Sequence, residues 1–468
     1  MLRMLIGLVA GWIAGANGTD LAVADDGREP CHLTIVVPEQ WQREATRYAR
    51  ARAPVVTAEV VTLESIVRDG QGRDEAEKIK RFLYARWQAK QLTHVLLIGD
   101  CSLLPVRYMV LDRATPAAHD YAFYPSDLYY ADLARRDGSF DDWNGAAEDF
   151  HAAYYGEVRG EKNKSDPINF DSIDYRPEIA VGRWPVQTPE QIAIAIQKSL
   201  AFERQVRKGR HPGAGRAALF SVGGWVDSRP QFDRIGERMA GWALVRRYYA
   251  DAGRDDGTGT PDSAAVQATI GEGVGVLFHA GHGDQSSWQH CVGGPQLEQI
   301  ESAGRWPILI SAGCSTAVFA PQAPYDAYLD IHGSLHEGTN AGEVFSAPPP
   351  PPACQQPTHL DPSSMGEHLV VGTEHGAVAY IGCATGSQPC ALSLLDGFAQ
   401  AIGAAPAELT LGDAWRSAVE HYYTAERLEQ LTPSESWYPP SIFFQGMKFV
   451  LFGDPSLPIP QAASPANR

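Results

Sequence analysis

Uninterrupted apolar runs that alternate with helical patterns constrain this chain more than any other feature. The segment 94–99 reads HVLLIG, and the segments 275–279 (GVLFH) and 307–312 (PILISA) have the same character. A strand without polar alternation is buried on both faces, as in a parallel sheet that helices cover. The segment 74–90 carries apolar residues at helical spacing. The sequence therefore predicts an α/β fold of mostly parallel strands flanked by helices.

The length of 468 residues predicts more than one core. The segment 209–215 (GRHPGAG) is a boundary, because the alternation of strands and helices restarts after it. We expect an N-terminal α/β subdomain over 25–212, a second α/β subdomain over 213–460 and a short tail over 461–468.

Two stretches interrupt this alternation. Residues 112–177 are rich in Tyr, Asp and Gly without a clear period, and residues 320–362 contain five consecutive prolines at 348–352. We interpret both as insertions, and we expect the proline run to be solvated polyproline II.

Two further segments are predicted to form helices, over 231–250 and 438–449.

The first 24 residues have the features of an export signal. Arg3 precedes a short apolar run at 5–13, and small residues at 14–16 and 22–24 both fit a cleavage site. The run is shorter than the roughly 20 residues that a bilayer span needs. We therefore expect a signal peptide over 1–24 and a secreted or periplasmic protein without a membrane span. The alternative is a buried helix that begins the mature domain.

Charge and cysteine count narrow the class of protein further. The net charge of −17 argues against binding to nucleic acid or to an anionic membrane. The seven cysteines are an odd number, so at least one thiol stays unpaired in an oxidising compartment. Three disulfides and one free thiol would use them all, and Cys383 with Cys390 is the expected local pair.

Two of the apolar strands end at a reactive side chain. One continues into Gly281-His282-Gly283, and the other into Gly313-Cys314. Because the carboxyl ends of neighbouring parallel strands meet at one edge of a sheet, we expect His282 to lie beside Cys314. An imidazole can take the thiol proton and later give it to a leaving amine. The amides of Gly283 and Cys314 are candidate donors to an oxyanion.

Other functions fit some of the same residues. A zinc-dependent hydrolase would draw its ligands from the set His279, His282, His290, Cys291 and Cys314. His279 and His282 are an odd number of positions apart at a strand end, however, and so point to opposite faces. A catalytically inactive exported binding or adhesion protein on the same fold is the other alternative.

The His and Cys segments resemble those of the gingipain-like cysteine peptidases, which share a caspase-like fold with caspases, legumains and clostripain. Three further segments carry the resemblance: 126–130 (SDLYY), 177–183 (PEIAVGR) with the Thr-Pro-Glu that follows at 188–190, and 452–457 (FGDPSL). Together these motifs cover the chain from about residue 94 to about residue 458.

This resemblance implies a caspase-like fold of two subdomains, the second being catalytic. It implies a secreted endopeptidase that hydrolyses peptide bonds of proteins or peptides through a thioester acyl-enzyme, without a cofactor for the chemistry. Cys314 would be the nucleophile, His282 its proton carrier and Gly283 part of the oxyanion hole.

The chain departs from the family near residues 217–222. Gingipains carry an acidic residue after the matching strand that orients the histidine, whereas Val222 and Gly223 follow here. Asp227 is the nearest acid and therefore the candidate for that role. Asp233 lies where an arginine-specific relative keeps its specificity acid.

The first insertion contains carboxylates in a glycine-containing loop. Such hard oxygen ligands suit calcium, and family members bind structural Ca²⁺. The candidate ligands are Asp127, Asp132, Asp137 and Asp141. The alternative is a solvated acidic loop. Arg183, after a buried strand, is expected to be a structural ion-pair partner.

Overall fold

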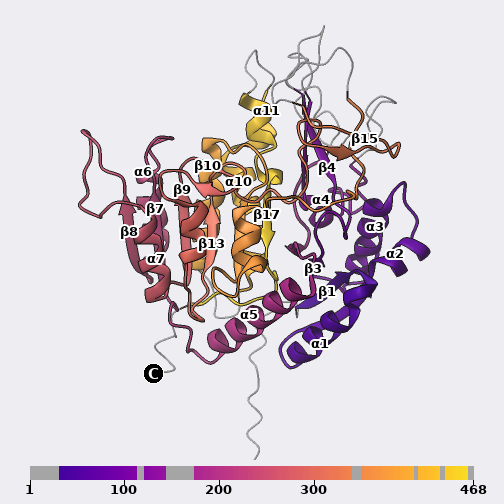
Figure 1. The fold of residues 1–468 in the computed structure, drawn as a ribbon, viewed down its shortest axis with the longest axis horizontal. Coiled ribbons are helices and arrows are strands. Elements are labelled where there is room, and N and C mark those ends of the chain that lie inside the picture. The colour runs from indigo at the N-terminus through magenta and orange to yellow at the C-terminus, as the bar shows by residue number, and fades with distance from the viewer. Residues whose placement is uncertain are drawn as a thin grey trace, which may run out of the picture. The chain divides into compact units, whose positions relative to one another are not determined.

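The computed structural model describes residues 31–112, 121–143, 173–339, 349–404, 409–432 and 438–461 (Figure 1). The predicted signal peptide, much of the first insertion and most of the tail lie outside these residues. All the elements named below belong to one compact unit that begins at Cys31.

Among the described residues, ten strands form one sheet in the spatial order β2-β1-β3-β6-β17-β16-β13-β9-β7-β8. Their bounds are His32–Val37 (β1), Thr57–Thr62 (β2), His94–Ile98 (β3), Ala180–Trp184 (β6), Arg216–Ser221 (β7), Ala243–Tyr248 (β8), Val276–Ala280 (β9), Ile308–Ser311 (β13), Ala379–Cys383 (β16) and Phe449–Phe452 (β17). β1 pairs in parallel with β2 and β3, β3 with β6, and β16, β13, β9, β7 and β8 pair in parallel in that order, whereas β17 is antiparallel to β16. The expected fold of mostly parallel strands is confirmed.

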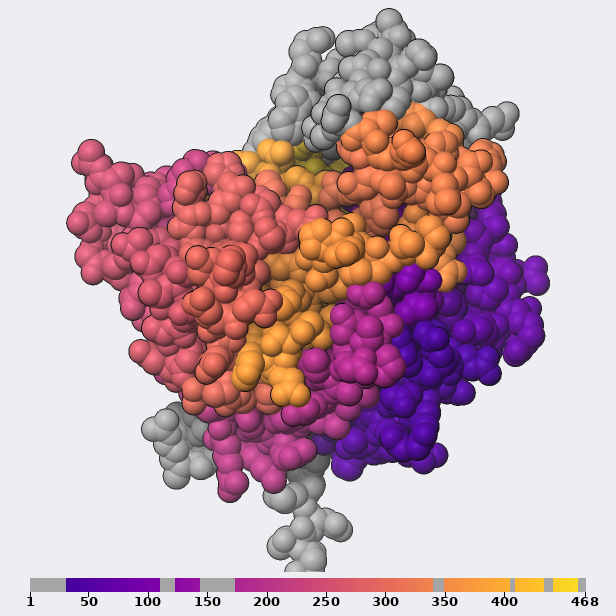
Figure 2. Space-filling model, in the orientation of Figure 1, coloured from indigo at the N-terminus to yellow at the C-terminus, as the bar shows by residue number. Residues whose placement is uncertain are grey.

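The order of the strands sets which parts of the chain lie at each end of the sheet. The early strand β2 forms one edge, and β8, from the middle of the chain, forms the other. The space-filling view shows the same arrangement on the surface, with indigo residues at one side, pink and red residues at the other, and orange segments between them (Figure 2). Late segments of the chain therefore fill the centre of the molecule.

The described residues also form helices. They are Gln42–Arg52 (α1), Leu63–Asp69 (α2), Glu75–Gln88 (α3), Leu128–Ala131 (α4), Pro189–Arg207 (α5), Arg229–Arg238 (α6), Ser263–Glu272 (α7), Met365–Glu367 (α8), Leu392–Gly403 (α9), Leu411–Ala425 (α10) and Tyr438–Phe443 (α11). Leu96 and Leu97 of β3 are fully buried in two different apolar clusters. Because successive side chains of a strand point to opposite faces, this shows burial on both faces of the sheet.

Short strands and short helical segments lie at the edges of this core. The small strands are Tyr108–Asp112 (β4), Tyr121–Pro125 (β5), Gly283–Asp284 (β10), Ser287–Trp288 (β11), Val292–Gly293 (β12), Tyr328–Leu329 (β14) and Leu335–His336 (β15). The single turns of 3₁₀ or π helix are Glu39–Trp41 (η1), Gly294–Gln299 (η3), His368–Gly372 (η4), Pro389–Ala391 (η5), Leu428–Gln430 (η6) and Gly446–Lys448 (η7). No described helix is both long and apolar enough to cross a bilayer.

One predicted helix is wrong in part, because it contains a strand. The helix predicted over 231–250 ends at Arg238 and is followed by the edge strand β8. The helix predicted over 438–449 is found as α11 and the turn η7, and only its last residue, Phe449, belongs to the buried strand β17. Short apolar runs have no period that separates a strand from a buried helix turn, so only the neighbouring strands decide their conformation.

The described part of the second insertion packs against the protein. It contains the hairpin β14–β15, and Pro352 forms a bridge with Asp330. Pro351 and Pro352 are buried, so the expectation of a solvated proline run is wrong for this part. The proline carbonyls explain the difference, because they remain acceptors: Tyr328 donates its hydroxyl to Pro350 O over 2.9 Å.

Strands from both predicted subdomains join in this one sheet, where Phe452 of β17 meets Arg183 of β6. The FGDPSL segment that follows β17 is held by a buried charge cluster. Arg52 of α1 contacts Asp454 at 2.6 Å and Glu203 of α5 at 2.9 Å. The segment therefore has a structural role, since Arg52 of α1 links its Asp454 to Glu203 of α5. The division at residue 212 stays a prediction.

Candidate active site

The two strands that carry the predicted catalytic residues are neighbours. β9 and β13 are parallel, and His279 pairs with Ser311 at their carboxyl ends. The loop of His282 and the loop of Cys314 therefore leave the same edge of the sheet side by side. A methyl group built on Gly283 would lie 2.8 Å from the carbonyl oxygen of Cys314 and 3.1 Å from its nitrogen. The two loops are in contact, and only glycine at position 283 permits this approach.

The imidazole of His282 is held by a backbone carbonyl. Its Nε2 lies 2.8 Å from the carbonyl oxygen of Gly224, in the loop after β7. Gly224 has a positive φ of 95°, a conformation that favours glycine. Sequence reasoning missed this partner because every residue has a carbonyl group. The only signal was the pair of glycines directly after the strand.

Asp227, predicted to orient His282, and Asp233, the candidate specificity acid, both contact arginines. Asp227 accepts from Arg229, whose Nε lies 2.8 Å from its Oδ1. The side-chain hydrogen bond from Arg229 lowers the pKa of Asp227. Asp233 forms an ion pair of 2.8 Å with Arg254. The imidazole of His282 is thus held by Gly224 rather than by either carboxylate.

Cys314 carries a partly exposed thiol that lies against the loop after β16. The amide of Ser387 donates to its Sγ over 3.3 Å, and the thiol lies 3.7 Å from the carbonyl oxygen of Ser387. The buried side chain of Gln445 holds this loop by donating to Ser387 Oγ and accepting from the amide of Gln388. Neither Ser387 nor Gln445 was predicted, because they are distant from Cys314 in the sequence and belong to no motif.

All seven cysteines lie in the described residues, and all are free thiols. The predicted pair of Cys383 and Cys390 is therefore wrong. Cys383 ends the buried strand β16, and Cys390 contacts the hydroxyl of Tyr422 at 3.4 Å. Burial raises the pKa of Cys383 to about 12 and that of Cys390 to about 11, so both thiols stay protonated.

The amide of Gly283 is available to a ligand. Gln289 donates its amide to the carbonyl oxygen of His282 over 3.0 Å. In an antiparallel ladder this bond makes Gly283 and Trp288 a non-hydrogen-bonded pair, so the Gly283 N–H does not point at the partner strand. A methyl group on Gly313 would lie 3.2 Å from the Cα of Gly283. The two glycines thus allow the amides near His282 and Cys314 to approach one another.

The four predicted calcium ligands do not fit one ion. Both carboxylate oxygens of Asp127 accept from Arg183 at 2.7 Å, which also confirms Arg183 as an ion-pair partner. Asp137 is exposed and caps the turn at Ser139. Asp132 and Asp141 are buried and bind the ring and backbone N–H groups of Trp143, respectively.

A buried ammonium group lies near the last two of these carboxylates. Lys80 packs over the ring of Trp143 at 4.9 Å. Burial lowers the pKa of Lys80 to about 8, and the charges of Asp132 and Asp141 oppose this shift. Lys80 and Arg135, which lies 3.9 Å from Asp141, are thus cations that the structure places near these carboxylates.

The zinc ligands of the alternative interpretation do not meet. His279 is fully buried and stacks on Trp288, whereas His290 is exposed. Within the described ranges, no three His, Cys, Asp or Glu side chains gather so that they could hold a metal ion.

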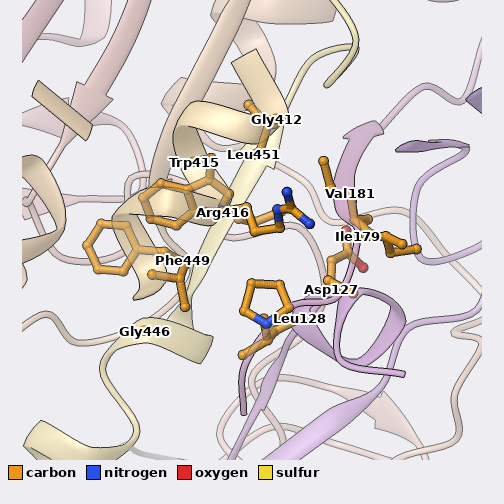
Figure 3. Close-up of a pocket in the computed structure, with 15 residues that line it drawn as sticks. Asp127, Leu128, Ile179, Val181, Gly412, Trp415, Arg416, Gly446, Phe449 and Leu451 are labelled. Carbon is orange, nitrogen blue, oxygen red and sulfur yellow. The ribbon is translucent and has the colours of Figure 1, made fainter. Parts of the chain in front are cut away.

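A pocket of about 30 Å³ lies elsewhere in the fold, beneath α10 (Figure 3). Trp415 and Arg416 from α10, Phe449 and Leu451 from β17, and Asp127 line it. Its lining contains neither His282 nor Cys314. It is not the cleft in which a peptide would meet the thiol.

Three solved structures are similar to this chain. They are the crystal structure of the Arg-specific cysteine proteinase gingipain R (TM-score 0.60, 14% identity), the complex of Porphyromonas gingivalis RgpB pro- and mature domains (TM-score 0.59, 15% identity), and a structure described as a protease (TM-score 0.58, 13% identity). Each match covers 92% of this chain and 79% of the other. At this identity the likeness shows a shared fold. A comparison with curated proteins gives no match.

The family itself is shown by a sequence model. The model of Peptidase family C25 matches residues 26–460, which include every strand of the sheet and both predicted catalytic residues. The expected gingipain-like resemblance is confirmed, and protein substrates follow from the family. The chain belongs to peptidase family C25 and is a gingipain-like cysteine peptidase.

Proposed function

We propose that this protein is an exported cysteine endopeptidase in which Cys314 and His282 form the catalytic dyad. The observation that carries the proposal is the parallel pairing of β9 with β13, which brings the loops of these two residues into contact. The thiol is free and partly exposed, as a nucleophile must be.

The first half of the reaction forms the acyl-enzyme. His282 takes the proton of the Cys314 thiol, and the sulfur attacks the carbonyl carbon of the scissile peptide. The C–N bond then breaks, and the proton held by His282 passes to the leaving amine. In the second half, water attacks the thioester while His282 takes its proton. The C–S bond breaks, and that proton returns to the sulfur.

Gly224 orients the imidazole in place of an acidic residue. A carbonyl oxygen only accepts hydrogen bonds, so the Nε2 of His282 must carry the hydrogen of this 2.8 Å contact. The other nitrogen, Nδ1, is then the one that exchanges a proton with the thiol. This hydrogen bond fixes the tautomer and the orientation of the imidazole, as an acidic residue would, but it adds no charge to the site.

The amides of Gly283 and Cys314 are the proposed oxyanion donors. They lie on the two loops that are in contact, within reach of one bound carbonyl group. Donors fixed before the reaction stabilise the developing charge without reorganisation.

Export rests on the sequence features of residues 1–24, which have a positive start, an apolar run and small residues before the predicted cleavage site. N-terminal sequencing of the protein after expression with its native leader tests this. A first residue at about position 25 supports export, and an intact Met1 in the extracellular fraction contradicts cleavage.

The dyad is tested with purified protein and a peptide library, with Ca²⁺ and with a chelator. We expect hydrolysis by the wild type and none by Cys314→Ala or His282→Ala, with folding unchanged by circular dichroism. Cys291→Ala is the matched control, because burial raises the pKa of this thiol to about 12 and keeps it unreactive. Mass spectrometry should find dilute iodoacetamide first on Cys314. Turnover by Cys314→Ala would exclude this nucleophile.

A further inference from the structure

A second histidine lies directly beneath the proposed dyad and takes no part in its proton transfer. His279 is in β9 and Ser311 in β13, and the two residues are register partners. Each lies three residues before a member of the dyad, His279 before His282 and Ser311 before Cys314. A contact between them therefore joins the two strands at the ends from which the two loops begin.

His279 and Ser311 form a buried cross-strand hydrogen bond. The Nδ1 of His279 lies 2.9 Å from the Oγ of Ser311, and neither residue has exposed surface. The same Oγ accepts the amide of Gly313 over 3.1 Å. The peptide that leads into Cys314 is therefore held by Ser311, and Ser311 is held by His279. Water cannot compete for these bonds in a closed interior.

The surroundings of His279 fix the orientation of its ring. Trp288 of β11 stacks on it with ring centres 4.3 Å apart and planes within 5°. Trp288 is itself held by a hydrogen bond of 2.9 Å from Nε1 to the hydroxyl of Tyr380. Since β11 belongs to the hairpin that begins at Gly283, this stack also connects the ring to the proposed oxyanion loop.

His279 is not a proton carrier. Burial lowers its pKa to about 3, so the ring is uncharged at neutral pH. Packing alone does not explain why a histidine occupies this position either. Its Nε2 is buried without a hydrogen-bond partner, a cost that a phenylalanine stacked on Trp288 would avoid. What phenylalanine could not provide is the bond to Ser311.

We propose that His279 is a positioning residue of the peptidase site, which acts through Ser311 to fix the Cys314 loop against the His282 loop. This inference rests on the proposed dyad. It assigns to His279 a role in setting the geometry of attack, on which rates depend steeply, since a misplacement of about 1 Å can cost about 100-fold.

The test separates activity from stability. We expect His279→Phe to keep the melting temperature of the wild type or exceed it, because the unpaired nitrogen disappears. Its kcat should fall about 10- to 100-fold with little change in KM. His279→Asn, whose amide reaches the place of Nδ1, should recover most of the kcat. The double variant with Ser311→Ala should be no slower than the slower single variant, because both changes remove the same hydrogen bond.

His94→Phe is the matched control, since His94 is also a buried strand histidine with hydrogen bonds to threonine hydroxyls. It should leave kcat unchanged. A His279→Phe enzyme with kcat within twofold of the wild type overturns the inference, and so does a parallel loss of kcat and melting temperature. Loss of all activity in both Cys314→Ala and His282→Ala within the same assay establishes the dyad independently. If Cys314→Ala still turns over substrate, it is the proposed function that fails.

Discussion

The Nε2 of His282 lies 2.8 Å from the carbonyl oxygen of Gly224, so a main-chain group orients the imidazole of this site. Gly224 occupies the region in which sequence reasoning looked for an acid. The nearby carboxylate of Asp227 is neutralised by Arg229 at 2.8 Å. Because the partner is a main-chain group, no side-chain substitution removes this hydrogen bond. The contribution of a nearby side chain, such as that of Asp227, can therefore be measured separately.

Asp227→Asn should therefore leave the specificity constant, kcat/KM, within about twofold of the wild type, because the side chain acts on Arg229 rather than on His282. The carboxylate is half exposed, and such pairs contribute at most about 1 kcal/mol to stability. Steady-state kinetics on a peptide substrate and urea denaturation measure both quantities. A specificity constant lowered about 100-fold at unchanged stability would show that Asp227 orients the histidine after all.

Gly283→Ala should reduce the specificity constant by more than about 100-fold, the scale of losing an oxyanion donor. The added methyl group would lie 2.7 Å from the Cγ2 of Thr316 and 2.8 Å from the carbonyl oxygen of Cys314, which forces the two loops apart. Gly271→Ala in α7 is the matched control, since nothing lies within 4 Å of its new methyl group. An active Gly283→Ala enzyme would contradict the contact between the loops.

Asp454→Asn should lower the free energy of unfolding by about 3–5 kcal/mol, because it leaves the Arg52 guanidinium buried with an incomplete set of acceptors. Arg52 and Asp454 have no exposed side-chain surface and lie 2.6 Å apart. Urea denaturation followed by tryptophan fluorescence measures the change. Asp69→Asn, which removes the exposed partner of Arg68, should cause no measurable change. Equal effects of the two substitutions would exclude a special role for the FGDPSL segment.

Asp396 should make stability depend on pH at the acid end. Burial opposes ionisation of this carboxyl, but hydrogen bonds from His421 and Arg238 prevail and lower its pKa to about 2. A depressed carboxyl pKa stabilises the fold above the unfolded pKa of about 4, by about 2 kcal/mol. That stability is lost as the pH falls from about 5 towards 2.

Urea denaturation of the wild type and of Asp396→Asn between pH 3 and pH 7 measures this effect. The difference in the free energy of unfolding should be largest at neutral pH and shrink at pH 3. A difference that stays constant over this range would assign the effect to packing among α6, α9 and α10.

Sequence reasoning found the parts of this fold that depend on local pattern. The apolar strands β3, β9 and β13 are buried on both faces, so their composition alone reports their environment. The contact between the loops of His282 and Cys314 follows from parallel pairing of two such strands. The strand β8 was taken for the end of a helix because its residues fit a helix equally well until β7 is in place beside it.

The site residues that were not predicted were missed for a different reason. They act through main-chain groups or lie far from the site in the sequence. Gly224 contributes a carbonyl oxygen and Ser387 an amide, groups that nearly every position in a chain offers. Asp127 was proposed as a calcium ligand because a sequence does not reveal that Arg183 lies across from it. Asp227 was chosen as the orienting acid because it is the acid nearest to the strand in the sequence. The sequence does not show that Arg229 pairs with it.

The place of β17 between β6 and β16 has a consequence for biosynthesis. The four residues of this strand are made after every other strand of the sheet, yet they lie at its middle. A ribosome that has released the chain only to about residue 430 would leave two sheets with open edges facing each other. Such edges recruit other chains, so the nascent protein should depend on chaperones until its final segment emerges.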